Sequence, residues 1–138
     1  MVGNAVMLPR PKLYTASKIH HAEKWQILRS SWKEIEFTSR WIDMGTLEGV
    51  YAPPPHIYRQ CWLMDRADVL ASDYLLCYAE ESDHLRGALV EAGMALASGI
   101  PVYTIGTHVD YGTWRHHPLV RNVPTLEVMR WEISGEEV

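Results

Sequence analysis

The chain has 138 residues, 47% of them hydrophobic and 22% charged, a composition typical of one globular domain spanning residues 1–138. A formal net charge of −4 and the lack of a basic cluster argue against nucleic acid as a partner. No apolar run reaches the roughly 18 residues of a membrane span, and no signal-peptide pattern is present, so we expect a cytoplasmic protein without a membrane partner.

The first third of the chain predicts two strands around a helix. An apolar strand over 12–16 is followed by Ser17, a suitable N-cap for a helix over 19–32. A strand that leads into a capped helix offers N–H groups and a hydroxyl to an anion, although no glycine-rich P-loop or Rossmann pattern is present. Residues 34–39 alternate like a short second strand.

Two adjacent histidines, His20 and His21, lie in the first predicted helix. Neighbouring residues of a helix point about 100° apart, which is a poor arrangement for binding one metal ion. A later polar segment, 107–117, also contains histidines and an aspartate, but its spacing matches no zinc pattern. We therefore expect no metal site and no cofactor.

Residues 44–55 contain two glycines and three consecutive prolines and predict a loop, which either covers a ligand pocket or is a surface insertion. The helix predicted over 56–72 carries Asp65 on the same face as Trp62 and Val69. An aspartate among such neighbours either makes a buried structural hydrogen bond or is held for chemistry, and the pattern alone leaves both interpretations open.

The middle of the chain predicts a strand over 74–79, a helix with apolar residues at helical spacing, and a second strand over 101–106. Two buried strands around a helix indicate a crossover of a parallel sheet, whose ligands bind beyond the carboxyl ends of the strands. Glu91 lies about 120° from the apolar stripe of this helix, neither plainly in the core nor plainly in solvent. Residues 118–123 and 125–131 predict a further strand and a closing helix capped by Thr125.

Four features of this pattern resemble the nucleoside 2-deoxyribosyltransferase family and its relatives that hydrolyse nucleoside 5′-monophosphates. They are Tyr14 followed by small residues, Asp65 eight residues before Asp73, the glutamate-containing segment 86–97, and the Gly-Ile-Pro-Val run over 99–102. The match covers roughly residues 12–106, and the glutamate segment is its most specific part.

The resemblance implies a single-domain, flavodoxin-like three-layer α/β sandwich with about five parallel strands. It also implies that Glu91 is a nucleophile that attacks the anomeric carbon and forms a glycosyl-enzyme ester. Asp65 matches the carboxyl that protonates the departing base, and Tyr14 matches the tyrosine that holds the nucleophile. These roles suit an oxocarbenium-like transition state, which a facing carboxylate stabilises.

The resemblance also places substrate-binding residues. Asp83 lies two residues out of register with the aspartate that contacts the base. Arg86, next to Gly87, is not part of the transferase pattern. At a helix N-terminus Arg86 would bind a 5′-phosphate together with Ser17 or Ser39. The alternative is that Arg86 pairs with an acidic residue of its own loop.

The leading hypothesis is therefore an enzyme that acts on the N-glycosidic bond of a nucleoside or nucleotide, either a transferase or a hydrolase. Two alternatives remain: a nucleotide-binding sensor without catalysis, and an enzyme that cleaves NAD. The family resemblance and the six tryptophans favour a homo-oligomer.

Overall fold

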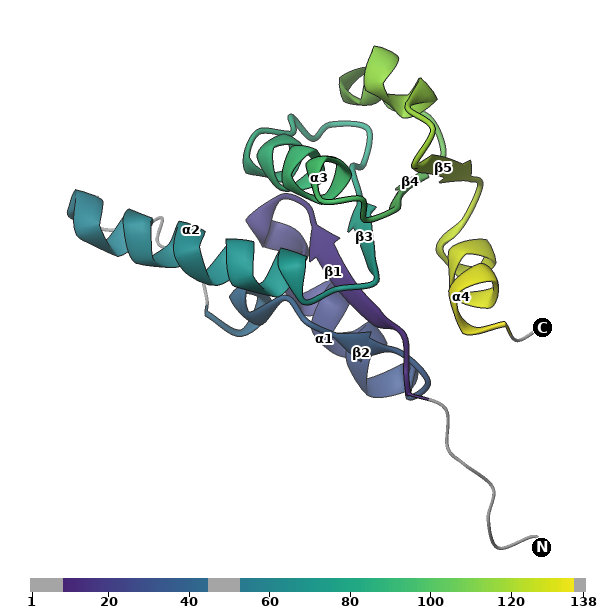
Figure 1. Cartoon of the computed structure of the whole chain (residues 1–138), viewed down its shortest axis with the longest axis horizontal. Coiled ribbons are helices and arrows are strands. Elements are labelled where there is room, and N and C mark those ends of the chain that lie inside the picture. Colours follow the sequence, from purple (N-terminus) through teal and green to yellow (C-terminus); the bar gives the residue numbers. More distant parts are fainter. Residues whose placement is uncertain (1–8, 45–52, 136–138) are drawn as a thin grey trace, which may run out of the picture.

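A computed structural model of the chain describes residues 9–44 and 53–135. One all-parallel sheet has the strand order β2-β1-β3-β4-β5. Its strands are β1 (Lys12–Ala16), β2 (Glu36–Phe37), β3 (Tyr74–Cys77), β4 (Val102–Ile105) and β5 (Val120–Val123). The helices of the described residues that flank it are α1 (Ala22–Ser31), α2 (Pro55–Leu70), α3 (Gly87–Ala97) and α4 (Leu126–Ser134). The predicted flavodoxin-like sandwich is confirmed (Figure 1).

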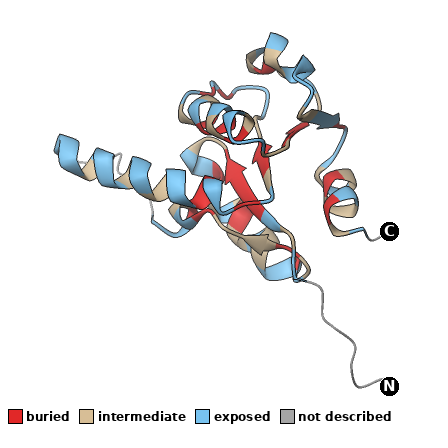
Figure 2. Cartoon of the chain, in the orientation of Figure 1, coloured by how far each residue is buried: buried red, intermediate tan, exposed pale blue. Residues whose placement is uncertain are grey.

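Alternating strand residues divide the core into two layers, because successive side chains of a strand point to opposite faces. Tyr14, Leu75 and Val102 pack with α2 and α3, whereas Leu13 and Leu76 pack with α1 and α4. Figure 2 shows the buried residues concentrated on the central strands and on the helix faces turned toward them. The sheet is therefore covered on both faces, as a parallel sheet requires.

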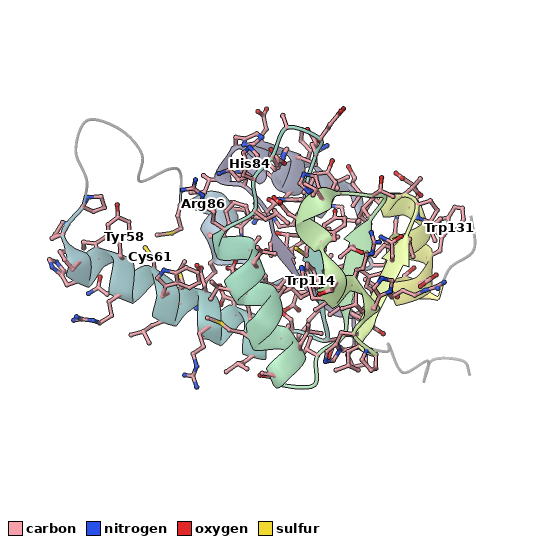
Figure 3. All side chains as sticks on the ribbon, turned by 90° about the horizontal axis from the view of Figure 1, so that it is seen from above. Tyr58, Cys61, His84, Arg86, Trp114 and Trp131 are labelled. Atoms are coloured by element: carbon pink, nitrogen blue, oxygen red, sulfur yellow. The ribbon has the colours of Figure 1, made fainter. Side chains whose placement is uncertain are left out.

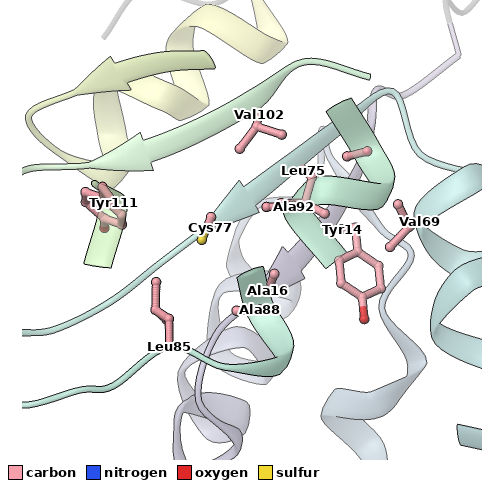
Figure 4. Packing of buried hydrophobic residues seen from close by; sticks show 11 residues of the cluster. Tyr14, Ala16, Val69, Leu75, Cys77, Leu85, Ala88, Ala92, Val102 and Tyr111 are labelled. Carbon is pink, nitrogen blue, oxygen red and sulfur yellow. The ribbon is translucent and has the colours of Figure 1, made fainter. Parts of the chain in front are cut away.

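Helix α3 lies close to the sheet because its inward positions carry small side chains. Ala88, Ala92 and Ala95 are buried in the same core cluster as Leu75 and Val102. Figure 4 shows Ala92 beside Leu75 and Ala88 beside Ala16. This close approach brings the second turn of α3, which contains Glu91, next to strand β1.

Helix α2 differs from the others because much of it is exposed. Its last residues, including Val69, join the core, but its N-terminal half extends beyond the sheet (Figures 1 and 2). Tyr58, Trp62 and Leu63 are among the large apolar side chains that it leaves at the surface.

Two local predictions were wrong. Ser17 caps no helix: the chain enters a 3-10 turn, η2 (Ile19–His21), before α1, and the Ser17 hydroxyl instead accepts a hydrogen bond from Trp25 Nε1 at 2.9 Å. The second strand is also shorter than the predicted 34–39, because only Glu36–Phe37 pair with β1. Thr125, in contrast, caps α4 by accepting a hydrogen bond from the Val128 N–H, as predicted.

The predicted loop over 44–55 falls mostly outside the described residues, so neither interpretation of it is tested. Among the helices within 9–44 and 53–135, none has the length and apolar character needed to cross a membrane.

Candidate functional site

The buried centre of the candidate site is a hydrogen bond between β1 and α3. The Tyr14 hydroxyl donates to Glu91 Oε2, and both side chains are buried. Tyr14 is the middle residue of β1, and its ring packs beside Val69 of α2 and Ala92 of α3 (Figure 4). The backbone therefore fixes Glu91 and its donor on two different rigid elements.

Asp65 of α2 contributes a second carboxyl to this centre. Its Oδ1 atom is buried and has no hydrogen-bond partner among the described residues. Burial and the nearby Asp68 raise the pKa of Asp65 to about 6, against the lowering effect of Arg40. The raised pKa leaves a share of Asp65 protonated near pH 6, and the protonated form is the one that can act as a general acid.

The pKa of Glu91 is raised to about 8, mainly by burial and further by the charge of Asp65, while the Tyr14 hydrogen bond lowers it. Burial, followed by the charges of Glu91 and Asp65, raises the pKa of Tyr14, so this hydroxyl remains a donor at neutral pH. Between about pH 6 and 8 the two carboxyls therefore hold one proton between them. Because the pKa of Glu91 is the higher of the two, this proton resides mainly on Glu91, and the minor form with an ionised Glu91 and a protonated Asp65 supplies one carboxylate nucleophile and one acid.

Asp68, one helical turn after Asp65, is held by Arg40 and was missed by the sequence analysis. The Arg40 Nε donates to Asp68 Oδ1 at 2.9 Å, and the Arg40 backbone N–H donates to Oδ2 at 3.1 Å. The spacing of Asp65 and Asp68 places both on one helix face and gave a usable signal. The sequence carries no signal for the contact between Arg40 and Asp68, because 28 residues separate the two.

The two serines predicted to bind phosphate are engaged elsewhere. Ser39 is 2% exposed, and its hydroxyl accepts a hydrogen bond from the Thr15 N–H at 3.1 Å and lies 2.8 Å from Thr15 Oγ1. The Ser17 hydroxyl donates to the Lys18 carbonyl and accepts from Trp25. Both hydroxyls thus connect β1 to neighbouring segments.

Arg86 stands immediately before α3 and is exposed (Figure 3). Among the described residues it has no hydrogen-bond or ion-pair partner, so the predicted alternative of pairing within its own loop is not found. No side chain caps the N-terminus of α3, where Gly87 is the first residue. A β-carbon at Gly87 would meet Trp62 at an ordinary contact distance of 3.5 Å, so packing does not require glycine there.

Asp83 belongs to a different cluster from Glu91. It is 4% exposed, lies 2.7 Å from His21 Nε2, and accepts a hydrogen bond from the Glu80 N–H at 2.8 Å. Burial alone would raise its pKa, but the bonds from Glu80 and His21, with the nearby His20, hold the pKa of Asp83 below the ordinary value. The structure thus brings Tyr14, Asp65 and Glu91 together and places Asp83 apart.

A shallow cavity of about 610 Å³ lies beyond β4 and is lined by Glu81, Thr107, His108, Val109 and Arg115. It includes neither Glu91 nor Asp65. The convergence of titratable groups, rather than this cavity, defines the candidate site.

No family model matches the chain, and no curated protein matches its sequence. Solved structures do match its fold. A conserved protein from Enterococcus faecalis V583 aligns with a TM-score of 0.58 and 20% identity over 92% of this chain and 99% of its own. The CMP N-glycosidase BcmB of Clostridium botulinum aligns with a TM-score of 0.53 and 16% identity over 87% of this chain and 93% of its own. At these identities the likeness shows a shared fold.

Proposed function

We propose that this chain is an enzyme that breaks the N-glycosidic bond of a nucleoside 5′-monophosphate or nucleoside, with Glu91 as the nucleophile. The observation that carries the proposal is the meeting of Glu91, Tyr14 and Asp65 in one buried centre. The shared fold with a CMP N-glycosidase supports the same class of bond.

In the first step, a Glu91 oxygen forms a bond to the anomeric carbon while the bond from that carbon to the base nitrogen breaks. The electron pair of the broken bond moves to the base, which receives a proton from Asp65. Tyr14 holds the attacking carboxylate in position through its hydroxyl. In the second step, water or another base attacks the anomeric carbon, releases Glu91 and returns the proton to Asp65.

The guanidinium of Arg86, which has no hydrogen-bond or ion-pair partner among the described residues, supports a substrate with a 5′-phosphate. This side chain lies at the uncapped N-terminus of α3, whose N–H groups and dipole favour an anion. A monophosphate bound there would leave its sugar closer to the second turn of the same helix, where Glu91 lies. The engaged hydroxyls of Ser17 and Ser39 make Arg86 and the Gly87 backbone the stronger candidates for phosphate binding.

The exposed apolar side chains of α2 support a homo-oligomer. Tyr58, Trp62, Leu63 and Leu70 are each 38–58% exposed on this one helix. Exposed large apolar side chains of this kind suit contact with a second copy.

The direct test is release of free base from CMP, dCMP, cytidine and deoxycytidine, followed by chromatography. We expect base release to be faster from a monophosphate than from its nucleoside, and Glu91→Ala to reduce kcat by at least about 10³-fold. The matched control is Glu81→Ala, which removes an exposed carboxylate from the loop before α3. Full activity of the Glu91→Ala protein would refute the nucleophile, and ligand binding without base release would indicate a sensor.

A further inference from the structure

A second cluster of side chains lies where the chain leaves the adjacent strands β1 and β3. His20 and His21 belong to the 3-10 turn η2 after β1, and Asp83 belongs to the loop after β3. Because β1 and β3 are parallel neighbours, their carboxyl ends meet and bring these segments together although 62 residues separate His21 from Asp83.

The two imidazoles converge on one carboxylate. His21 Nε2 lies 2.7 Å from Asp83 Oδ2, and His20 Nε2 lies 3.4 Å from Asp83 Oδ1. The ring centroids of the two histidines are 4.0 Å apart, so the prediction that adjacent histidines diverge was wrong for this turn. Within 9–44 and 53–135 this is the one group of three such residues whose donor atoms all lie within 4.8 Å of one another.

We propose that His20, His21 and Asp83 bind a divalent transition-metal ion, with Zn²⁺ as the clearest example. Two imidazole nitrogens and one carboxylate oxygen form a donor set that Zn²⁺ uses in three-residue sites. Ligands about 2.0–2.1 Å from a tetrahedral ion are roughly 3.4 Å apart. The His20 Nε2–Asp83 Oδ1 separation has this value, the His21 Nε2–Asp83 Oδ2 separation is shorter, and the three donor atoms lie within 4.8 Å of one another, so small shifts of these side chains bring them to the spacing that one ion needs.

The surroundings suit a metal site that is firmly held on one side and open on the other. The side chains of His21 and Asp83 are only 5% and 3% exposed, and the Glu80 N–H binds the Asp83 carboxylate from outside the cluster. The His21 ring also packs edge-on against Tyr78. The His20 side chain is 61% exposed, which leaves room for a water molecule as the fourth ligand.

A hydrogen bond that anchors the loop after β3 accounts for the position of His21 next to Asp83. It does not account for the position of His20 next to the same carboxylate. A histidine as exposed as His20 gains little from an ion pair with Asp83 in water. Metal binding gives this second imidazole a role. The inference does not depend on N-glycosidic chemistry, because no hydrogen bond joins the cluster to Tyr14, Asp65 or Glu91 within the described part of the chain.

The test is isothermal titration of the full chain with ZnCl₂ after EDTA treatment and dialysis, together with thermal melting with and without zinc. We expect one Zn²⁺ per chain and a rise of the melting temperature on binding. His20→Ala removes an exposed ligand without opening the core, so it is expected to weaken zinc binding at least tenfold and to abolish the rise in melting temperature.

The matched control is His56→Ala, which removes an exposed histidine on α2 and is expected to bind zinc like the unmodified chain. Asp83→Asn, with its fold checked by circular dichroism, is expected to lose binding as His20→Ala does. The proposal is overturned if the unmodified chain shows no saturable one-to-one binding, or if His20→Ala binds zinc as tightly as the unmodified chain.

Discussion

Glu91 and Asp83 are two carboxyls with little solvent exposure, at 6% and 4%, but Glu91 lies deeper in the protein, and their pKa values shift in opposite directions. Asp83 has the Glu80 N–H and the imidazoles of His20 and His21 around it, which favour its charged form. Among the residues that the structure describes, Glu91 has one hydrogen-bond donor, the Tyr14 hydroxyl, and a second carboxyl, that of Asp65, lies nearby.

The comparison teaches that the depth of a carboxyl in the protein and the partners around it together decide its protonation. The Asp83 cluster satisfies its charge and holds two segments together. The Glu91 centre leaves its charge poorly satisfied, which is costly for folding and useful for chemistry.

The largest expected effect is on catalysis at the Glu91 centre. A pair with pKa values of about 6 and 8 predicts a bell-shaped dependence of kcat/KM on pH, with its maximum near pH 7. Asp65→Asn should lower kcat/KM by about 10²–10⁴-fold, because the departing base loses its proton donor. Its profile should rise with pH in a single step, since only Glu91 still titrates.

A substrate whose base leaves without needing a proton sharpens this test. With such a substrate the Asp65→Asn protein should release base almost as fast as the unmodified chain. An equal loss with both substrates, or an unchanged bell-shaped profile, would contradict the general-acid role of Asp65.

The next effect is on stability, and its sign follows from the raised pKa of Glu91. The unfolded chain releases this proton near pH 4.5 and the folded chain near pH 8, so stability falls as the pH rises through that interval. Glu91→Gln removes this loss and should raise the free energy of unfolding on the order of 4 kcal/mol at pH 8, and by less than about 1 kcal/mol at pH 5.

Guanidinium unfolding at the two pH values measures this difference, and the exposed Glu81→Gln is the control. A Glu91→Gln protein that is less stable than the unmodified chain at pH 8 would show that the charged form is well satisfied in the fold.

The smallest effect is expected at Asp83, with the opposite sign. Its lowered pKa contributes stability above the ordinary pKa near 4, and this contribution disappears as the pH falls below it. Asp83→Asn should therefore cost about 1–3 kcal/mol at pH 7, measured in EDTA by guanidinium unfolding. The cost should shrink toward pH 3. A pH-independent cost would mean that shape rather than charge decides the role of Asp83.

Much of the fold was predictable because its signals are local. The strand over 12–16, the helix with Ala88 and Ala92, and the Thr125 cap each depend on residues within a few positions of one another. Ser17 was mispredicted as a cap because Trp25, eight residues away, takes its hydroxyl.

The candidate site was predictable only in part. Glu91, Asp65 and Tyr14 were named through a family resemblance, and the structure brings them together, although 77 residues separate Tyr14 from Glu91. The His21 partner of Asp83 and the Arg40 partner of Asp68 come from segments 62 and 28 residues away, and nothing in the local sequence of either aspartate indicates the pairing. Spacing along a chain does not report contacts that only the sheet topology creates.

The covalent role of Glu91 is tested most directly by trapping the glycosyl-enzyme. The chain is incubated with a 2-fluoro nucleotide substrate, whose slow second step allows the ester to accumulate, and is then digested and analysed by mass spectrometry. We predict the added mass of one sugar phosphate on the peptide that contains Glu91, and no adduct on the Glu91→Gln protein. Base release with no adduct on that peptide, or with the sugar on another residue, would contradict the account.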